Sequence, residues 1–162
     1  MKSLILSLIL STISLPIYAK EHAIMGGQYL IDIPDEYVVK IAPKSENATV
    51  VVARSGRNSL SGINIVIYHA KVADDEDFKK NADGYFLSLK KGLKNFKEPK
   101  DLKGVIPRYK ASGTIPYKGV AYSMDAYAVR YDNIVFYNLL YLGDEDKKLL
   151  DAVMSTFQQK KQ

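Results

Sequence analysis

The sequence predicts an α+β fold, an α/β/α sandwich in which a central, mainly antiparallel sheet is covered by two helices. Extended segments rich in β-branched and aromatic residues lie on both sides of one long amphipathic stretch. A second, shorter amphipathic stretch lies near the C-terminus. The 162 residues are 47% hydrophobic and 25% charged. This composition is typical of a globular domain and argues against a disordered or multi-span membrane protein.

The first 19 residues have the pattern of a secretory signal peptide. Lys2 provides a positive start, Leu4–Ile13 is an apolar run, and the segment ends on the small residue Ala19. The run is short and interrupted by serines, so an uncleaved membrane anchor is the weaker alternative. We therefore expect cleavage near Ala19, a periplasmic location with no membrane span, and a single domain over residues 20–162.

The sequence of the first half of this domain predicts four strands, and each is bounded by Pro, Gly, Ser or Asn. They are Gln28–Ile33, Glu36–Ile41, Thr49–Arg54 and Ile63–His69. In the fourth strand, three isoleucines share one face and Val66 and Tyr68 share the other. Both faces are apolar, so we expect a sheet with a helix on each side.

The acidic run Asp74–Asp77 predicts a helix start, because carboxylates complement the positive end of the helix dipole. Apolar residues at helical spacing from Phe78 to Phe96 extend this predicted helix. The next segment, Lys97–Pro107, is expected to be an exposed loop because it mixes charges with Pro and Gly.

Three further strands and a helix are predicted in the second half. The strands are Tyr109–Ile115, Val120–Tyr131 and Ile134–Leu142. A two-residue turn at Asp132-Asn133 would place Ala128 opposite Tyr137 and Ala126 opposite Leu139. The final helix begins at Gly143-Asp144 and buries an apolar side. That side consists of Leu149, Leu150, Val153, Met154 and Phe157.

The segment from Tyr29 to Tyr37, Tyr-Leu-Ile-Asp-Ile-Pro-Asp-Glu-Tyr, runs an aromatic strand into Ile-Pro and a second aromatic residue. With the element order, it resembles the PsbP-like and DcrB-like α/β/α sandwich family of exported bacterial proteins. The chain departs from that pattern in lacking a lipidated cysteine and in having Tyr37 where tryptophan is expected in many members. The resemblance implies a non-catalytic accessory, chaperone or binding role.

The residue inventory excludes several chemistries. The chain has no cysteine and two histidines, so disulfides, thiolate metal sites, cysteine nucleophiles and histidine metal clusters are ruled out. No phosphate-binding glycine motif or nucleophile elbow is present. An enzyme would have to use Asp125, Tyr127 and His69, which show no spacing typical of a nucleophile and its base. We expect no enzyme and no cofactor, and interpret His69 as a hydrogen-bonded residue at a strand end.

His22 is the one candidate metal ligand. Cleavage after Ala19 would leave Lys20-Glu21-His22 at the new N-terminus. The amine, two amides and the imidazole could then form a square-planar nitrogen set, which suits Cu(II) or Ni(II). The alternative is a mobile terminus in which His22 is third by chance.

The predicted long helix carries a basic face opposite its apolar stripe. Lys90, Lys91 and Lys94 lie on this face with Leu87 among them, and Gly84 lies on a third face of small residues. A protein or anionic envelope partner could dock here, while an ordinary solvated face is the alternative. Glycine is costly within a helix, so we expect Gly84 to allow close packing, within the domain or against a partner.

Two further groups are candidate ligand sites. A polar cluster on one face of the last strand pair is either a satisfied hydrogen-bond network or a ligand pocket. It consists of Ser123, Asp125, Tyr127 and Asn138. Arg54 and Arg57 flank a turn-rich loop and could hold a phosphate or carboxylate.

These observations predict a non-enzymatic periplasmic binding or accessory protein that engages a protein or a cell-envelope component. The net charge of +5 favours acidic surfaces, whereas an exported protein is not expected to bind nucleic acid. The alternatives are a periplasmic immunity protein that neutralises a toxin and a small hydrolase.

Overall fold

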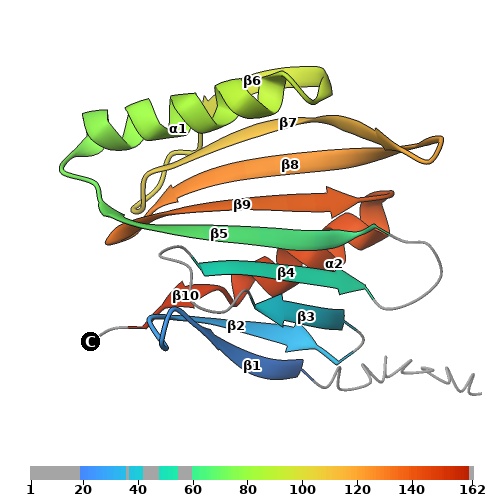
Figure 1. Ribbon diagram of the computed structural model, residues 1–162, viewed down its shortest axis with the longest axis horizontal. Coiled ribbons are helices and arrows are strands. Elements are labelled where there is room, and N and C mark those ends of the chain that lie inside the picture. The colour runs from blue at the N-terminus through green and yellow to red at the C-terminus, as the bar shows by residue number, and fades with distance from the viewer. Residues whose placement is uncertain (1–18, 36, 42–47, 55–59, 161–162) are drawn as a thin grey trace, which may run out of the picture.

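The computed structural model describes residues 19–35, 37–41, 48–54 and 60–160. Two helices and two antiparallel sheets make up this part of the chain, which confirms the α+β sandwich (Figure 1). The elements are β1 (Ala19–Ile24), β2 (Tyr29–Pro34), β3 (Tyr37–Ile41), β4 (Ala48–Arg54), β5 (Gly62–Lys71), α1 (Asp75–Lys90), β6 (Lys94–Asp101), β7 (Arg108–Tyr117), β8 (Val120–Arg130), β9 (Asn133–Tyr141), α2 (Asp144–Ser155) and β10 (Gln158–Gln159).

The larger sheet has seven strands in the order β3-β4-β5-β9-β8-β7-β6, and the smaller has the order β1-β2-β10. In Figure 1, α1 lies along the β6–β8 end of the large sheet, whereas α2 lies behind the sheet. Neither helix in the described part of the chain is long and apolar enough to cross a membrane.

One face of the large sheet is covered by α1 over β7, β8 and β9. The helix begins where the Asp74 carboxylate accepts a hydrogen bond of 2.9 Å from the Asp77 backbone N–H, a typical N-cap. Phe78 and Phe86 pack against small alanines of β7 and β8. Because alanine side chains are short, the aromatic rings of the helix can lie directly on the sheet.

The opposite face is covered by α2 and the small sheet. Leu150 and Val153 of α2 pack with the buried isoleucines of β5 and β2, and with Val135 and Leu139 of β9. This larger core contains no residue of β6 or β7, and Tyr127 is its only contribution from β8. The β6–β8 part of this face is therefore left outside the core.

The predicted helix end and the predicted loop after it are wrong in part, because α1 ends at Lys90 and β6 follows. The backbone N–H groups of Gly92 and Leu93 both bond to the Leu89 carbonyl, at 2.9 and 3.0 Å, and close the last turn. Asn95 then adopts a φ of 50°. Pairing of β6 with β7 shortens the loop to residues 102–107.

The predicted pairing of the last hairpin is wrong by one residue. Ala128 pairs with Phe136 rather than Tyr137, and Asp125 rather than Ala126 pairs with Leu139. The last paired residues are Arg130 and Ile134, so three residues separate them instead of the predicted two. The Tyr131 N–H is bonded to the carbonyl of Asn133, the first residue of β9, at 3.0 Å. A one-residue shift exchanges which residues of β8 and β9 share a face.

The sequence did not predict β1. This strand begins at the expected cleavage point and pairs along its length with β2. Ile24 at its end is 1% exposed and belongs to the larger core. The described N-terminal residues are therefore part of the fold.

Candidate functional site

The polar cluster predicted on the last hairpin is divided between the two faces of the sheet. Asn138 faces α1, where its side-chain oxygen accepts a hydrogen bond of 2.6 Å from the Tyr85 hydroxyl. Ser123, Asp125 and Tyr127 lie on the other face, because they pair with Tyr141, Leu139 and Tyr137. The predicted four-residue site is therefore wrong as a group, and three of its members remain together.

These three residues belong to what we call the open sheet face, the part of the α2 side formed by β6, β7 and β8. It contains a hollow of about 450 Å³ bordered by α2. The side chains that define it are Lys97, Lys110, Ser112, Thr114, Ser123, Asp125, Tyr141 and Lys147. The alternation of side chains along a strand explains why residues of β7 gather here. Lys110, Ser112 and Thr114 are every second residue of β7, so their side chains lie on the same face of the sheet.

A buried carboxylate organises this face. Asp125 is 3% exposed, and its Oδ2 lies 2.8 Å from Lys110 Nζ and 3.8 Å from Lys147 Nζ. Lys147 also forms an ion pair with Asp151 one turn along α2. We call Lys110, Asp125 and Lys147 the charge ladder. It links three separate elements, β7, β8 and α2, through one carboxylate.

Aromatic rings border the charge ladder. Lys110 Nζ lies 5.3 Å from the centre of the Tyr127 ring, and Lys147 Nζ lies 6.0 Å from that of Tyr141. Tyr127 in turn stacks on Tyr137 with ring centres 4.5 Å apart. Cation–π contacts of this length add to the ion pairs, so both ammonium groups are held between a carboxylate and a ring.

The pKa values of the ladder lysines are shifted upward. Burial lowers the pKa of Lys110, but its polar and charge interactions with Asp125 and Tyr127 together outweigh burial and raise it overall. The hydrogen bond to Asp151 is the main cause that raises the pKa of Lys147. Burial raises the pKa of the Tyr127 hydroxyl. At neutral pH both lysines are cationic and the tyrosine is protonated.

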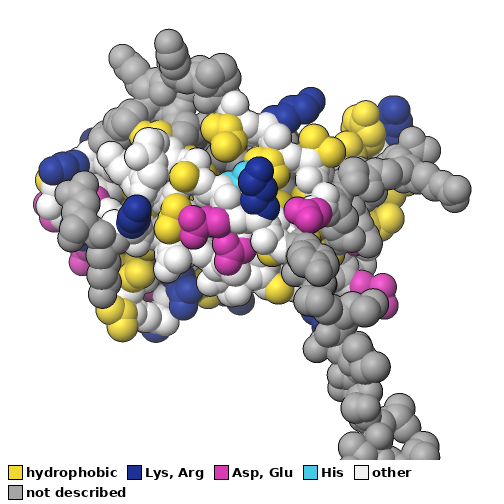
Figure 2. All heavy atoms as spheres, turned by 90° about the horizontal axis from the view of Figure 1, so that it is seen from below, with side chains coloured by type: hydrophobic (Ala, Val, Ile, Leu, Met, Phe, Trp, Pro, Cys, Tyr) yellow, Lys and Arg dark blue, Asp and Glu magenta, His cyan; other side chains and the backbone are white. Residues whose placement is uncertain are grey.

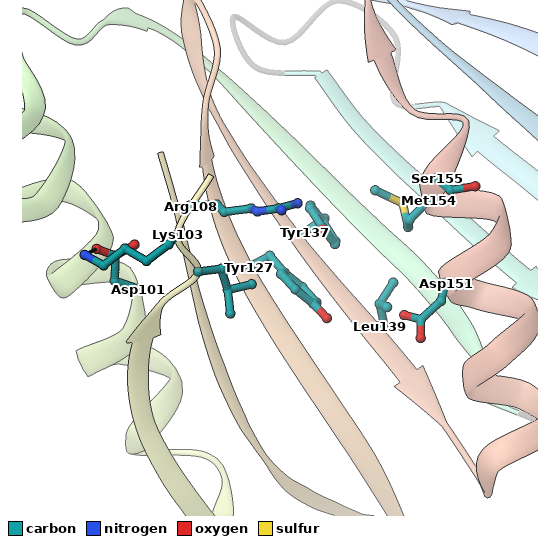
Figure 3. A pocket seen from close by; sticks show the side chains of 10 residues that line it. Asp101, Lys103, Arg108, Tyr127, Tyr137, Leu139, Asp151, Met154 and Ser155 are labelled. Carbon is teal, nitrogen blue, oxygen red and sulfur yellow. Dashed lines mark hydrogen bonds and ion pairs between the residues drawn. The ribbon is translucent and has the colours of Figure 1, made fainter. Parts of the chain in front are cut away.

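A second hollow of about 610 Å³, which we call the Arg108 cleft, lies beside the ladder between β7–β9, α2 and the loop over 102–107. Its lining consists of Asp101, Leu102, Lys103, Arg108, Tyr127, Tyr137, Leu139, Asp151, Met154 and Ser155. In Figure 3, the Arg108 side chain reaches toward Tyr137, and Met154 and Asp151 approach from α2 on the other side.

The predicted basic face of the helix is also divided. Lys90 is on α1 and pairs with Glu98 of β6, and Lys91 is the exposed C-cap residue. Lys94 lies in β6 opposite Thr114, so it is not on the helix. The three lysines do not form one helical stripe, because the helix ends before Lys94.

Gly84 and Leu87 are both exposed on α1. A Cβ atom added to Gly84 would meet nothing within 4 Å, so the expected close packing of this glycine within the domain is wrong. Leu87 is 61% exposed. It borders a shallow hollow of about 280 Å³ between α1 and β6.

Among the remaining candidates, His22 lies in β1 opposite Ile31. A copper site there would require the start of β1 to separate from β2. In the described part of the chain, no group of three histidine, aspartate or glutamate residues is arranged to hold a metal. Arg54 ends β4, with only its backbone described, and Arg57 lies outside the described residues.

The underside of the molecule, formed by the small sheet, shows acidic and basic side chains interspersed with apolar ones (Figure 2). The open sheet face differs from it in having linked charges beside two hollows. Sequence reasoning missed Arg108, Lys110 and Lys147 of this face. Strand alternation in β7 was the signal that could have placed the first two on one side with Ser112.

A comparison with protein-family models found no match, and no curated protein proved similar to the chain. The resemblance to the PsbP-like sandwich therefore stays a prediction.

Proposed function

We propose that this protein is a non-enzymatic binding protein of the periplasm that engages a protein or cell-envelope partner through the open sheet face. The observation that carries the proposal is the position of the charge ladder. It lies on a part of the sheet that belongs neither to the larger core under α2 nor to the apolar cluster under α1. Fixed charges on an uncovered face are suited to recognition, because a partner need not order them on binding.

The state of the side chains favours binding over catalysis. A general base or nucleophile needs a pKa near neutrality or an adjacent activating group. Here the pKa values of Lys110, Lys147 and Tyr127 are all raised, and the Asp125 carboxylate lies between two ammonium groups. The lysines and Asp125 hold charge, and the ammonium groups and the hydroxyl donate hydrogen bonds, which are the properties of a contact surface.

The charge of the surrounding strand indicates an acidic partner surface. Lys94, Lys97 and Lys100 of β6 pair with Thr114, Ser112 and Lys110, and so border the open face. These lysines are exposed. Complementary charge on the partner would speed the encounter and make association sensitive to salt. The implied accessory or binding role of the PsbP-like family belongs to the same functional class.

Affinity capture from an envelope extract tests the proposal with two matched double variants. Lys97→Glu with Lys100→Glu reverses charge on the open face, and Lys79→Glu with Lys80→Glu does the same on α1. We expect the first variant to lose a specific partner that the wild type and the second variant retain. The purified partner should then bind less tightly at higher salt. If all three proteins capture the same set, the open face is not the binding surface.

A third variant separates the two candidate surfaces of the molecule. Lys90→Glu with Lys91→Glu tests the remaining part of the predicted basic face at the end of α1. We expect this variant to keep the partner. Loss of the partner here, with retention by the β6 variant, would move the site to α1 and contradict the proposal.

A further inference from the structure

The Arg108 cleft contains one cation whose charge is not balanced within the described residues. Of the charged groups that line it, Lys103 pairs with Asp101 and Asp151 pairs with Lys147. Arg108 has no carboxylate partner in that part of the chain. Its guanidinium reaches across the cleft toward Tyr137 (Figure 3). An unpaired guanidinium beside a hollow can bind a planar anion through two parallel hydrogen bonds.

Tyr137 adds a hydrogen-bond donor at the same end of the cleft. Burial raises the pKa of its hydroxyl, and the positive charge of Arg108 only partly opposes this. The hydroxyl is therefore protonated at neutral pH. A neutral hydroxyl next to a guanidinium is suited to hydrogen-bonding an anionic oxygen.

The rest of the lining is mixed, since Asp101, Lys103, Asp151 and Ser155 are polar, but its apolar part matches the body of a small ligand. Leu139 is 1% exposed and lies with Met154 near the stacked rings of Tyr127 and Tyr137. The volume of about 610 Å³ is within the range of roughly 300–1,000 Å³ that is usual for small-molecule sites. One end of the cleft is thus cationic and the adjoining wall is aromatic and aliphatic.

We propose that the Arg108 cleft binds a carboxylate carried on a short apolar or aromatic body, with the carboxylate on Arg108 and Tyr137 and the body against Met154 and the stacked rings. This inference rests on the proposed function, since it assigns a ligand class to a cleft beside the charge ladder. A ligand with a single negative charge matches this cleft, because the guanidinium of Arg108 is the one unpaired cation among the described lining residues.

Titration of the isolated protein with benzoate, followed by proton–nitrogen NMR, tests the site directly. We expect saturable shifts in the backbone amides of residues 102–106 and 108 and in the Nε–H of Arg108. Benzamide, which has the same shape without charge, should cause no comparable shift. Arg108→Gln should weaken benzoate binding at least tenfold, as expected for loss of a charge-assisted contact, and Tyr137→Phe should weaken it several-fold.

Lys80→Gln is the matched control, because Lys80 is an exposed cation on α1 that does not line the cleft. We expect it to bind benzoate like the wild type. Equal binding of benzoate and benzamide would overturn the proposal, as would unchanged affinity in Arg108→Gln. Arg108→Lys, which keeps the charge but loses the planar fork, should bind with intermediate affinity.

Capture with Arg108→Gln separates this inference from the proposed function. If the partner is retained while benzoate fails to bind the wild type, only the cleft assignment fails. Partner loss in Arg108→Gln that free benzoate reproduces in the wild type would mean that the carboxylate belongs to the partner. Partner retention together with benzoate binding would mean that the ligand is a free acid.

Discussion

Asp125 is the residue on which the open sheet face depends. Its buried carboxylate balances two ammonium groups whose side chains are 28% and 30% exposed. Removing one member of a buried ion pair leaves the other charge without compensation. We expect Asp125→Asn to lower the free energy of unfolding by about 1–3 kcal/mol, a value reduced for the partial exposure of the lysines. Urea denaturation would measure it.

The exposed pair of Lys103 and Asp101 provides the comparison for that measurement. The Lys103 side chain is 88% exposed and that of Asp101 is 42% exposed, and ion pairs at the surface contribute little. Lys103→Gln should leave the urea midpoint unchanged. If Asp125→Asn also leaves the midpoint unchanged, the ladder does not stabilise the fold and the rigidity assumed for the open face is absent.

At the same scale, the sequence predicted part of the candidate site. A carboxylate within an apolar strand had to find polar partners, and Asp125 does so. Its partner Lys110 lies on a neighbouring strand and Lys147 on α2, at sequence distances that no local pattern encodes. Asn138 was assigned to the wrong face because its position depends on the number of residues between Arg130 and Ile134.

At the scale of elements, we expect replacement of two glycines by alanine to have opposite effects on stability. Gly84 lies inside α1 with open space where a Cβ would be. Gly113 lies in β7, and a Cβ there would be 3.0 Å from Leu93 Cβ and 3.1 Å from the Lys94 carbonyl oxygen. We expect Gly84→Ala to stabilise the protein by about 0.5–1 kcal/mol, because alanine loses less backbone entropy in a helix.

Gly113→Ala should instead destabilise, because β6 lies too close for a side chain and must move. Thermal unfolding of both variants under one set of conditions would show which substitution raises the melting temperature and which lowers it. A stabilising Gly113→Ala would mean that β6 does not approach β7 as described. A destabilising Gly84→Ala would show that this part of α1 is packed against something else in solution.

The same approach of β6 to β7 explains which elements the sequence predicted. Long apolar patterns located β5, β7, β8, β9 and both helices. The segment Lys94–Asp101 has Lys, Glu and Pro in place of β-branched residues. Its start, up to Phe96, was predicted as the end of the helix and the rest as a loop. It is a strand because Gly113 leaves room for its backbone at the sheet edge, where proline and lysine are tolerated.

For the whole molecule, the two faces of the large sheet have different roles. The α1 face is closed over β7, β8 and β9 by aromatic rings on alanines, while Asn64 and Tyr68 of β5 stay exposed. The other face is closed only over the half that α2 and the small sheet reach. Because β1 contributes Ile24 to this larger core, the described N-terminal strand helps to position α2, and thereby Lys147 of the ladder.

Buried tyrosines and paired lysines together determine how stability depends on pH. Burial raises the pKa of Tyr85 and Tyr137 above 10.0. The pKa of Lys110 is raised above 10.5, because its interactions with Asp125 and Tyr127 together outweigh burial. Above about pH 10 the unfolded chain therefore loses protons that the folded chain keeps. The folded state then binds more protons, so the free energy of unfolding must fall as pH rises.

We expect urea denaturation at about pH 8 and at about pH 11 to give a clearly lower free energy of unfolding at the higher pH. Tyr85→Phe and Tyr137→Phe should each reduce this difference, because each removes a group that titrates only after unfolding. Tyr117→Phe, at a residue 43% exposed, is the control and should keep the wild-type difference. A free energy of unfolding that stays constant or rises over this interval would show that the tyrosines are accessible to solvent, and that the layers of the sandwich are less tightly closed than their burial implies.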